Sequence, residues 1–500
     1  MIALRKLLCL LLSVIDLIIF QTGGEPKLMK EADVTITVNP FVEYQDLNGF
    51  GTSACWWAQL TDANDEYADE VARLLYSKEG LGLNIYRYNI GAGEKDNPNS
   101  RISGSRATES FYYYNEAKGQ YEYDFNRDAA AQAMLDKCLA YGCIDTVVLF
   151  ANSPHYSMTK TGYATGGYTE NESNLPPENY EAYADYFLTI TEYFLEKGIP
   201  VKYISPVNEP QWAWSGGWVG QEGCHYEPDE VIALFKVFAK KMKERNIDVQ
   251  LMGPESGTLD DARYDNYVTS DYFSRLYNDE DIKDVLGSLA YHSYWCDDPG
   301  ESWRKKDLGE LVNEKYSVIN VDMTEWCELP CAHSINDFDG ALLMARVILQ
   351  DLAYSNANSW TAWVGVNNYG IGEDGEKYSD AMLVSNEEFS ELYTGVRYYA
   401  MAHFSKYIPA GSTRISAKFD VTKERFVPLN MTAFKTPEGK IVVVIVNEEE
   451  IERNVYFDFI LGNMQVITST ADSQFKTVYS GRAKSKVNIP AKSITTVVYG

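Results

Sequence analysis

The 500-residue sequence predicts an α/β protein, a (β/α)8 TIM barrel with an appended antiparallel β-sandwich side domain. Between residues 48 and 394, short apolar segments alternate with longer segments of helical periodicity, which is typical of a parallel barrel. After about residue 397 the helical periodicity disappears, and short alternating runs separated by turn residues follow, as in a β-sandwich. Polar and aromatic residues gather at the expected strand ends, where barrels place their active sites.

The barrel prediction depends on eight strand-like segments separated in most cases by helical patterns. The helical run 128–141 is followed by Gly142 and the run 180–197 by Gly198, and glycine is a common helix stop. Further helices are predicted over 62–77, 229–245 and 338–354. The expected barrel strands are 48–53, 83–88, 146–150, 203–207, 249–252, 286–291, 318–323 and 359–363.

Residues 395–500 are predicted to form the β-sandwich. Residues 25–47 are expected to join it, because the alternating run from Val34 to Val38 reads as a strand and precedes the barrel. The expected C-terminal strands are 415–419, 429–434, 441–446, 455–459, 466–470 and 494–499.

The first 24 residues have the pattern of a signal peptide. Arg5 and Lys6 precede an apolar run from Leu7 to Phe20, which is shorter than the roughly 20 residues of a membrane-spanning helix. We therefore expect a secreted or extracytoplasmic protein with no membrane association after cleavage. An uncleaved anchor is the alternative. The oligomeric state is open, and a monomer is favoured.

Charge and cysteine content narrow the functional classes. The formal net charge of -28 argues against nucleic-acid binding and disfavours polyanionic substrates. Seven cysteines follow the signal sequence, so complete intramolecular pairing is excluded; Cys327 and Cys331 are either a disulfide or two free thiols. No zinc-type spacing occurs and the five histidines are scattered, so we expect no metal and no cofactor.

Two predicted strand ends carry a glutamate close to a tryptophan. Glu209 lies in Asn208-Glu209-Pro210 with Trp212 two residues further on, and Glu325 lies in Thr324-Glu325-Trp326. Glycoside hydrolysis usually needs two carboxyl groups flanking the scissile bond, one protonated and one ionised. Either glutamate alone is more simply interpreted as a solvated strand-end carboxylate, but the matched pair favours catalysis.

Four motifs together resemble glycoside hydrolase family 30: Gly49-Phe50-Gly51, Val207-Asn208-Glu209-Pro210, His292-Ser293-Tyr294 and Thr324-Glu325-Trp326. That family joins a (β/α)8 barrel to a β-sandwich built from both chain ends. The resemblance implies a retaining mechanism with Glu209 as general acid/base and Glu325 as nucleophile. A retaining pair lies about 5 to 5.5 Å apart. Burial and the nearby Glu325 would favour a protonated Glu209.

The resemblance also assigns supporting residues. Arg87 and Tyr294 would hydrogen-bond Glu325, and Asn208 would contact the sugar 2-hydroxyl. Structural alternatives are an ion pair for Arg87, a turn cap for Asn208 and a core position for His292, while the aromatic residues could be simple packing. The predicted substrate-binding residues are Arg87, Asn208, His292, Tyr294, Trp363, Tyr156, Trp57 and Trp212.

The substrate prediction rests on two further segments. Ala54-Cys55-Trp56-Trp57 resembles the stretch after the first strand in the endo-β-1,6-galactanase branch, and Trp212, Trp214 and Trp218 could extend a stacking surface. The glucuronoxylanase branch grips a glucuronate with basic residues after strand eight, but residues 372–377 here are largely acidic.

We therefore expect a secreted retaining β-glycosidase that hydrolyses a neutral β-linked polysaccharide, as an endo-β-1,6-galactanase on arabinogalactan-type chains. The alternatives within the family are a β-xylanase, a β-1,6-glucanase or an exo-acting β-glycosidase. A catalytically inactive carbohydrate-binding protein is the alternative from another class, and the presence of both glutamates argues against it.

Overall fold

The computed structural model describes residues 34–500 apart from 64, 103, 216–219, 261–267 and 421–428. The predicted signal peptide, residues 1–24, lies outside these described residues, as does Trp218. Among the described helices, none combines the length and the apolar character that crossing a bilayer requires.

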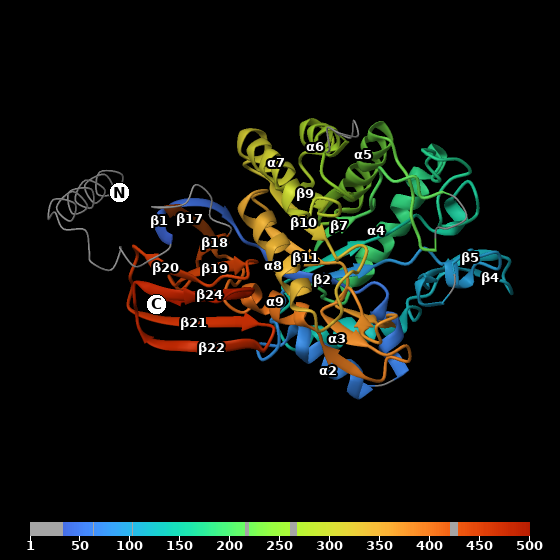
Figure 1. Cartoon of the computed structure of the whole chain (residues 1–500). Helices are drawn as coiled ribbons and strands as arrows, with labels where there is room; N and C mark the ends of the chain where they lie inside the picture. The colour runs from blue at the N-terminus through green and yellow to red at the C-terminus, as the bar shows by residue number, and fades with distance from the viewer. Residues whose placement is uncertain (1–33, 64, 103, 216–219, 261–267, 421–428) are drawn as a thin grey trace.

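The described residues contain a closed barrel of parallel strands at the centre of the molecule (Figure 1). Neighbouring strands follow the chain order around the barrel, and the last strand pairs with the first, so the predicted fold class is confirmed. The barrel strands are β2 (Gly49–Ser53), β3 (Ile85–Asn89), β6 (Thr146–Phe150), β7 (Val201–Ser205), β8 (Gln250–Ser256), β9 (Leu286–His292), β10 (Asn320–Glu325) and β11 (Ser359–Ala362).

Helices cover the outside of the barrel. Two of them, α6 and α7, were not predicted. In α7 the apolar stripe is reduced to residues such as Leu308 and Val312 within a strongly charged segment, so the sequence pattern is weak. The helices are α2 (Asp65–Tyr76), α3 (Ala129–Leu139), α4 (Tyr180–Glu196), α5 (Pro228–Arg245), α6 (Val268–Asn278), α7 (Ser302–Lys315), α8 (Phe338–Ala353) and α9 (Val396–Ser405).

Local sequence sets the ends of α5. Pro228 occupies the first turn, and Glu227 and Glu230 form a reciprocal capping box with the backbone at the N-terminus. The helix stops at Asn246, whose left-handed backbone is typical of a C-terminal cap. α5 therefore begins and ends where its sequence dictates.

Short strands lie within the loops at the mouth of the barrel. The hairpin formed by β4 and β5 lies between β3 and α3, and the remaining strands follow β11. Their bounds are β4 (Tyr112–Asn115), β5 (Gln120–Tyr123), β12 (Val366–Asn368), β13 (Gly370–Ile371), β14 (Lys377–Tyr378), β15 (Leu383–Ser385) and β16 (Leu392–Thr394).

The second unit is a β-sandwich in which β1, blue in Figure 1, lies among red C-terminal strands. β1 pairs antiparallel with β17 and parallel with β20, so residues 34–46 of the predicted N-terminal segment lie in the sandwich, while residues 25–33 lie outside the described residues. Helix α9 and strands β22 and β23 were not predicted. The strands are β1 (Val34–Asp46), β17 (Thr413–Asp420), β18 (Leu429–Lys435), β19 (Ile441–Asn447), β20 (Arg453–Phe457), β21 (Asn463–Thr470), β22 (Ser473–Arg482), β23 (Lys486–Ile489) and β24 (Ser493–Tyr499).

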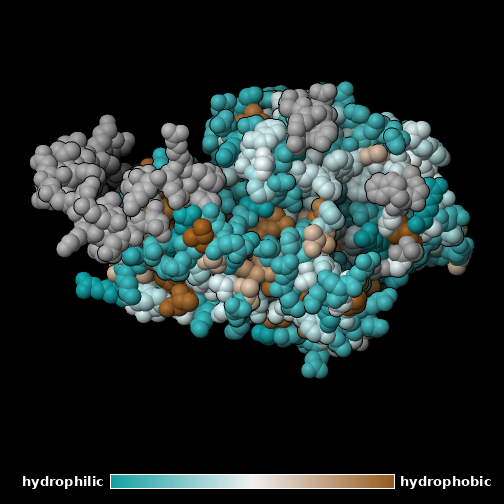
Figure 2. Space-filling model, in the orientation of Figure 1, coloured by the Kyte–Doolittle hydropathy of each residue, from teal (hydrophilic) through white to brown (hydrophobic). Residues whose placement is uncertain are grey.

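Helices α8 and α9 join the sandwich to the barrel. α8 packs on β18 and β19, and α9 packs on β22 and β24. Every residue of β19 is buried, because Val442 and Val444 face the barrel-side core while Val443 and Ile445 face the core of the sandwich. The face seen in Figure 2 is mainly hydrophilic, with hydrophobic groups scattered in small patches, in keeping with the high negative charge.

Candidate active site

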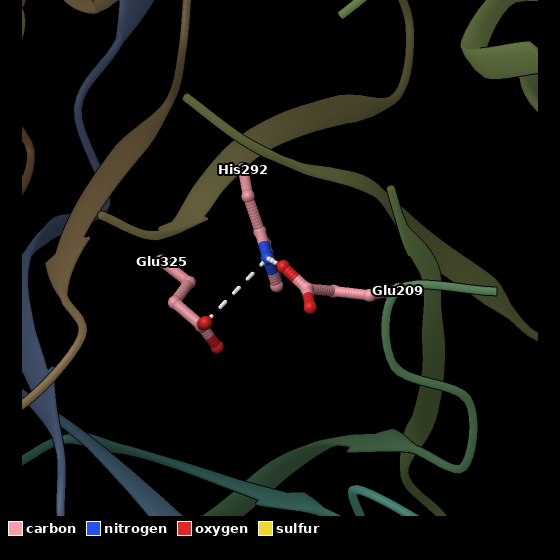
Figure 3. Close-up of side chains that lie close together, drawn as sticks. All are labelled: Glu209, His292 and Glu325. Carbon is pink, nitrogen blue, oxygen red and sulfur yellow. Dashed lines mark hydrogen bonds and ion pairs between the residues drawn. The ribbon is translucent and has the colours of Figure 1, made fainter. Parts of the chain in front are cut away.

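Glu209 lies beyond the end of β7, at the carboxyl-end mouth of the barrel. Its φ of 47° is uncommon for a residue other than glycine. The Glu209 amide donates to the carbonyl of Glu255 at 2.8 Å, and its own carbonyl accepts from the indole N–H of Trp214 at 2.9 Å. These two bonds hold the turn that directs the Glu209 carboxylate toward Glu325 in Figure 3.

Glu325 is the last residue of β10, and its carboxylate accepts two hydrogen bonds. Arg87 donates to Oε2 at 2.8 Å, and the hydroxyl of Tyr294 donates to Oε1 at 3.0 Å. The second guanidinium nitrogen of Arg87 donates to Oδ1 of Asn208 at 3.0 Å. Both donors favour the ionised form of Glu325, which is the form that a nucleophile needs.

The two carboxylates are close together. One oxygen of Glu209, one oxygen of Glu325 and a ring nitrogen of His292 all lie within 4.8 Å of one another. Retaining glycosidases place their carboxyl groups about 5 to 5.5 Å apart, whereas inverting enzymes need roughly 6.5 to 9.5 Å to admit a water molecule. The spacing here is that of a retaining pair.

His292 lies between the two glutamates (Figure 3) and is fully buried. Its Nδ1 is 3.0 Å from Oε1 of Glu209 and 3.7 Å from Oε1 of Glu325. Burial lowers the pKa of His292, but the carboxylates of Glu325 and Glu209 outweigh burial and raise it to about 9. His292 is therefore an imidazolium at neutral pH, and the interpretation as an ordinary core histidine does not hold.

Glu325 is affected by opposing influences. Burial raises the pKa of its carboxyl, His292 and Arg87 oppose that rise, and Glu209 adds to it. The net result is a raised pKa for Glu325, while the hydrogen bonds from Arg87 and Tyr294 stabilise its ionised form.

Glu209, His292 and Glu325 also have the spacing of metal ligands. A metal-bound histidine must offer a ring lone pair. Here Nδ1 of His292 faces Glu209 and Nε2 faces Glu255 at 3.2 Å, so in the imidazolium both nitrogens carry protons. In this arrangement the three side chains fit an acid, a nucleophile and a cation between them.

Glu255 is the functional residue that the sequence analysis missed. It lies in β8, is fully buried, and contacts both cations of the site: His292 at 3.2 Å and Arg87 at 3.6 Å. The predicted strand stopped at Met252, before Pro254, because proline is rare in central strands. The acidic residue that directly follows this proline was the one sequence feature that could have pointed to Glu255 as a site residue.

Trp212 lies beside the acid/base candidate. A methyl group added at Gly257 would overlap Nε1 of Trp212 and would lie 2.9 Å from Oε1 of Glu209. The indole and the carboxylate therefore lie against the same glycine, which leaves both of them room. Trp212 therefore lies next to Glu209, and its contact with substrate stays a prediction.

The other predicted aromatic residues are distributed differently. Trp57 was expected to bind substrate, and this is wrong: it is 1% exposed, and its Nε1 donates to the carbonyl of Ser53 at 2.9 Å, within the core. Its neighbour Trp56 is the partly exposed one and meets Trp363 edge to face, with ring centroids 5.3 Å apart. Tyr156 is buried and packs against His155, and it has no described contact with either catalytic glutamate.

Trp295 was not singled out from the sequence. It directly follows Tyr294, its side chain is 52% exposed, and its backbone is left-handed with φ 60°. Both neighbours, Tyr294 and Cys296, are buried, so the loop is fixed on either side of an outward-facing indole.

Among the described cysteines all seven are free thiols, so Cys327 and Cys331 are not bonded to each other.

Comparison with known proteins agrees with this geometry. The model of O-glycosyl hydrolase family 30 matches residues 33–383, and the model of the glycosyl hydrolase family 30 beta sandwich domain matches residues 411–497. The chain belongs to glycoside hydrolase family 30. The family is retaining, so the predicted enzyme class, a retaining O-glycosyl hydrolase, is confirmed.

Relatives within the family are distant. An endo-beta-1,6-galactanase of Hypocrea rufa is 22% identical, over 83% of this chain and 81% of its own length. An exo-beta-1,6-galactobiohydrolase of Bifidobacterium longum is 24% identical, over 69% of this chain and 28% of its own. The crystal structure of a conserved exported protein from Bacteroides fragilis superposes with a TM-score of 0.80 at 22% identity, covering 93% of this chain and all of that one.

Proposed function

We propose that this family 30 enzyme is an exported endo-β-1,6-galactanase that cleaves neutral galactan chains of the arabinogalactan type. The observation that carries the chemistry is the close pair of Glu209 and Glu325, with oxygens within 4.8 Å and with Arg87, Tyr294 and His292 as donors. The likeness to two proteins named for β-1,6-galactan hydrolysis supports the choice of sugar.

The site residues perform two displacements at the anomeric carbon. In the first, the ionised Glu325 attacks that carbon while Glu209 gives its proton to the glycosidic oxygen, and the bond to the leaving sugar breaks. In the second, Glu209 takes a proton from water, the water oxygen attacks the same carbon, and Glu325 is released. Two inversions leave the configuration of the sugar unchanged.

Features around the site support a neutral polysaccharide. Trp56, Trp295 and Trp363 present partly exposed rings near the mouth, and such rings stack on the apolar faces of sugars. The segment after β11 contributes Lys377 as its cation, and this ammonium is stacked between Tyr369 and Tyr393, 4.3 Å and 3.8 Å from their ring centroids. A grip on a uronate by this segment is therefore disfavoured.

The test is product analysis on de-arabinosylated arabinogalactan, β-1,6-glucan, xylan and small aryl β-glycosides. Galactose oligomers of several lengths from the first substrate alone would support the proposal. A single short product released from chain ends would favour exo action, for which the similar galactobiohydrolase is a precedent. Activity on xylan or β-1,6-glucan would show that the proposed substrate is wrong and would leave the retaining mechanism unchanged. A folded protein that is inactive on every substrate would instead be a carbohydrate-binding protein.

A further inference from the structure

A third carboxylate, that of Glu255, lies behind the catalytic pair. Its Oε1 accepts from the hydroxyl of Ser205 at 2.9 Å and is 3.6 Å from Arg87. Its Oε2 is 3.2 Å from Nε2 of His292 and also accepts from the hydroxyl of Thr324. All of these partners come from other barrel strands, so the buried carboxylate of Glu255 connects four strands at the barrel mouth.

The two cations of the site each bridge Glu255 to one catalytic glutamate. Arg87 extends from Glu255 to Glu325, and His292 extends from Glu255 to Glu209. The backbone adds a third link, because the carbonyl of Glu255 accepts the amide of Glu209 at 2.8 Å. Glu255 is therefore separated from each member of the pair by one side chain, and its charge also raises the pKa of Glu325 directly.

A charge count shows what the third carboxylate does. Arg87 and His292 are cations, and ionised Glu255 and ionised Glu325 are anions, so the cluster is neutral when Glu209 holds a proton. Without the charge of Glu255, the same proton count would leave one positive charge uncompensated in a buried site. Such a site releases a proton more easily. The proton would come from His292 or from Glu209, and either loss impairs the acid.

We propose that Glu255 is a positioning residue whose negative charge balances those of Arg87 and His292, so that His292 stays charged and directed at Glu209 while the catalytic pair still holds one proton. This inference rests on the proposed roles of Glu209 and Glu325 and deepens them. Glu255 does not touch the reacting atoms, and it acts through Arg87 and His292.

The ionisable groups around Glu255 and His292 come from several strands. His292 faces Glu209 beyond β7, Glu255 on β8 and Glu325 on β10, and its ring meets that of Tyr294 at 5.9 Å. Burial opposes ionisation of Glu255, but Arg87 and His292 outweigh it and lower the pKa of this carboxyl to about 2.

Two more groups lie near this site. Asp322 on β10 has a raised pKa through burial, to which the charge of Glu255 adds. Cys55 lies close to Arg87, and burial raises the pKa of its thiol well above the usual range. Asp322 bonds Ser288 and Cys55 bonds Asn152, and neither has a described side-chain hydrogen bond or ion pair with Arg87 or His292, so neither takes the place of Glu255 between the two cations.

The test follows the protonation of His292 directly. The chain has five histidines, and a His292→Gln variant identifies the His292 signal in the NMR spectrum. In the wild type, His292 should stay protonated well above neutral pH. In Glu255→Gln it should lose its proton at least about one pH unit earlier, and the alkaline limb of kcat/KM for an aryl glycoside should move by a similar amount.

Two variants serve as matched controls. Glu255→Asp retains the charge and should keep the His292 titration within about half a pH unit of the wild type. Glu328→Gln removes another buried carboxyl, which is ion-paired with Arg397 and has no described contact with His292. It should leave both the titration and the pH profile in place.

A His292 that is neutral at pH 7 in the wild type would overturn the proposal even if Glu255→Gln did not fold. An unshifted His292 titration in folded Glu255→Gln, with activity lowered equally at every pH, would also overturn it and would make Glu255 a purely structural residue. The NMR titration does not depend on the sugar. A wild type that is inactive on every glycan but has a charged His292 would therefore reject the proposed function alone.

Discussion

Two buried histidines of this protein have opposite charge states. His292 in the barrel mouth and His403 in α9 are both fully buried, and both ring nitrogens of each are hydrogen-bonded. His292 is surrounded by carboxylates and its pKa is raised to about 9, against the effect of burial. The ring nitrogens of His403 bond the hydroxyls of Thr496 and Ser469, its ring meets Phe475 edge to face, and burial lowers its pKa to about 3.

The comparison shows that burial alone does not decide the charge of a side chain. Hydroxyl partners satisfy a neutral ring and leave the cost of burying a charge in place, whereas three carboxylates more than offset that cost. At the junction between barrel and sandwich, hydroxyl partners keep a neutral histidine buried, which serves stability. At the barrel mouth, carboxylate partners keep a charged histidine buried, and this cation in turn stabilises carboxylates that would otherwise repel one another.

The most severe test of the barrel-mouth cluster is Glu325→Ala. Loss of the nucleophile should lower kcat by about 10⁴-fold or more, because the covalent intermediate can no longer form. The measurement is turnover of a dinitrophenyl β-glycoside, with far-UV circular dichroism as the control for folding. Activity within tenfold of the wild type would exclude Glu325 as the nucleophile.

Glu209→Ala should have a smaller effect that depends on the leaving group. Substrates that need protonation should lose about 10² to 10⁴-fold in kcat, while dinitrophenyl glycosides should be much less affected. Added azide should raise the rate and give a glycosyl azide of retained configuration, measurable by proton NMR. An azide product of inverted configuration would show that the roles are the reverse, with Glu209 as nucleophile and Glu325 as general acid/base.

Gly257→Ala probes the fit of the acid without removing it. The added methyl group would overlap Nε1 of Trp212 and crowd Oε1 of Glu209, so kcat/KM should fall by about tenfold through misplacement of the carboxylate. Gly370→Ala is the control, because its methyl group would enter open space. Equal activity of both variants would show that the loop around Gly257 relaxes.

The mildest test concerns His403 and leaves catalysis unchanged. Its folded pKa of about 3 lies below the ordinary value of 6.5, so the unfolded chain takes up a proton that the folded protein refuses. Stability from this site is therefore lost as pH falls below about 6.5. His403→Gln should reduce the acid destabilisation at about pH 4.5 by about 2 to 3 kcal/mol.

Thermal unfolding at neutral and acidic pH measures this effect, with turnover of an aryl glycoside as the control. For His292 the sign is reversed. Its raised pKa stabilises the fold fully below about pH 6.5, and that contribution is lost as pH rises through about 9. A His403→Gln variant with unchanged acid sensitivity would mean that this ring is already charged in the folded protein.

The sequence by itself determined the order of the barrel strands, the participation of the N-terminal strand in the sandwich, and the pair Glu209 and Glu325. These follow from short-range patterns: strand and helix periodicity, glycine stops, and glutamates placed where strands end. A parallel barrel brings all the carboxyl ends of its strands to one face, so two glutamates that are far apart in the chain could be paired from the sequence alone.

Tertiary structure alone decided which neighbours each side chain meets. It buried Trp57 and left Trp56 at the mouth, inserted Glu255 beneath the catalytic pair, and charged His292 while keeping His403 neutral. The distinction between adjacent tryptophans depends on the direction of one side chain. The charge of a histidine depends on groups that are far away in the chain. Such long-range electrostatics and packing leave no periodic signal in the sequence, because they arise only when the strands close into a barrel.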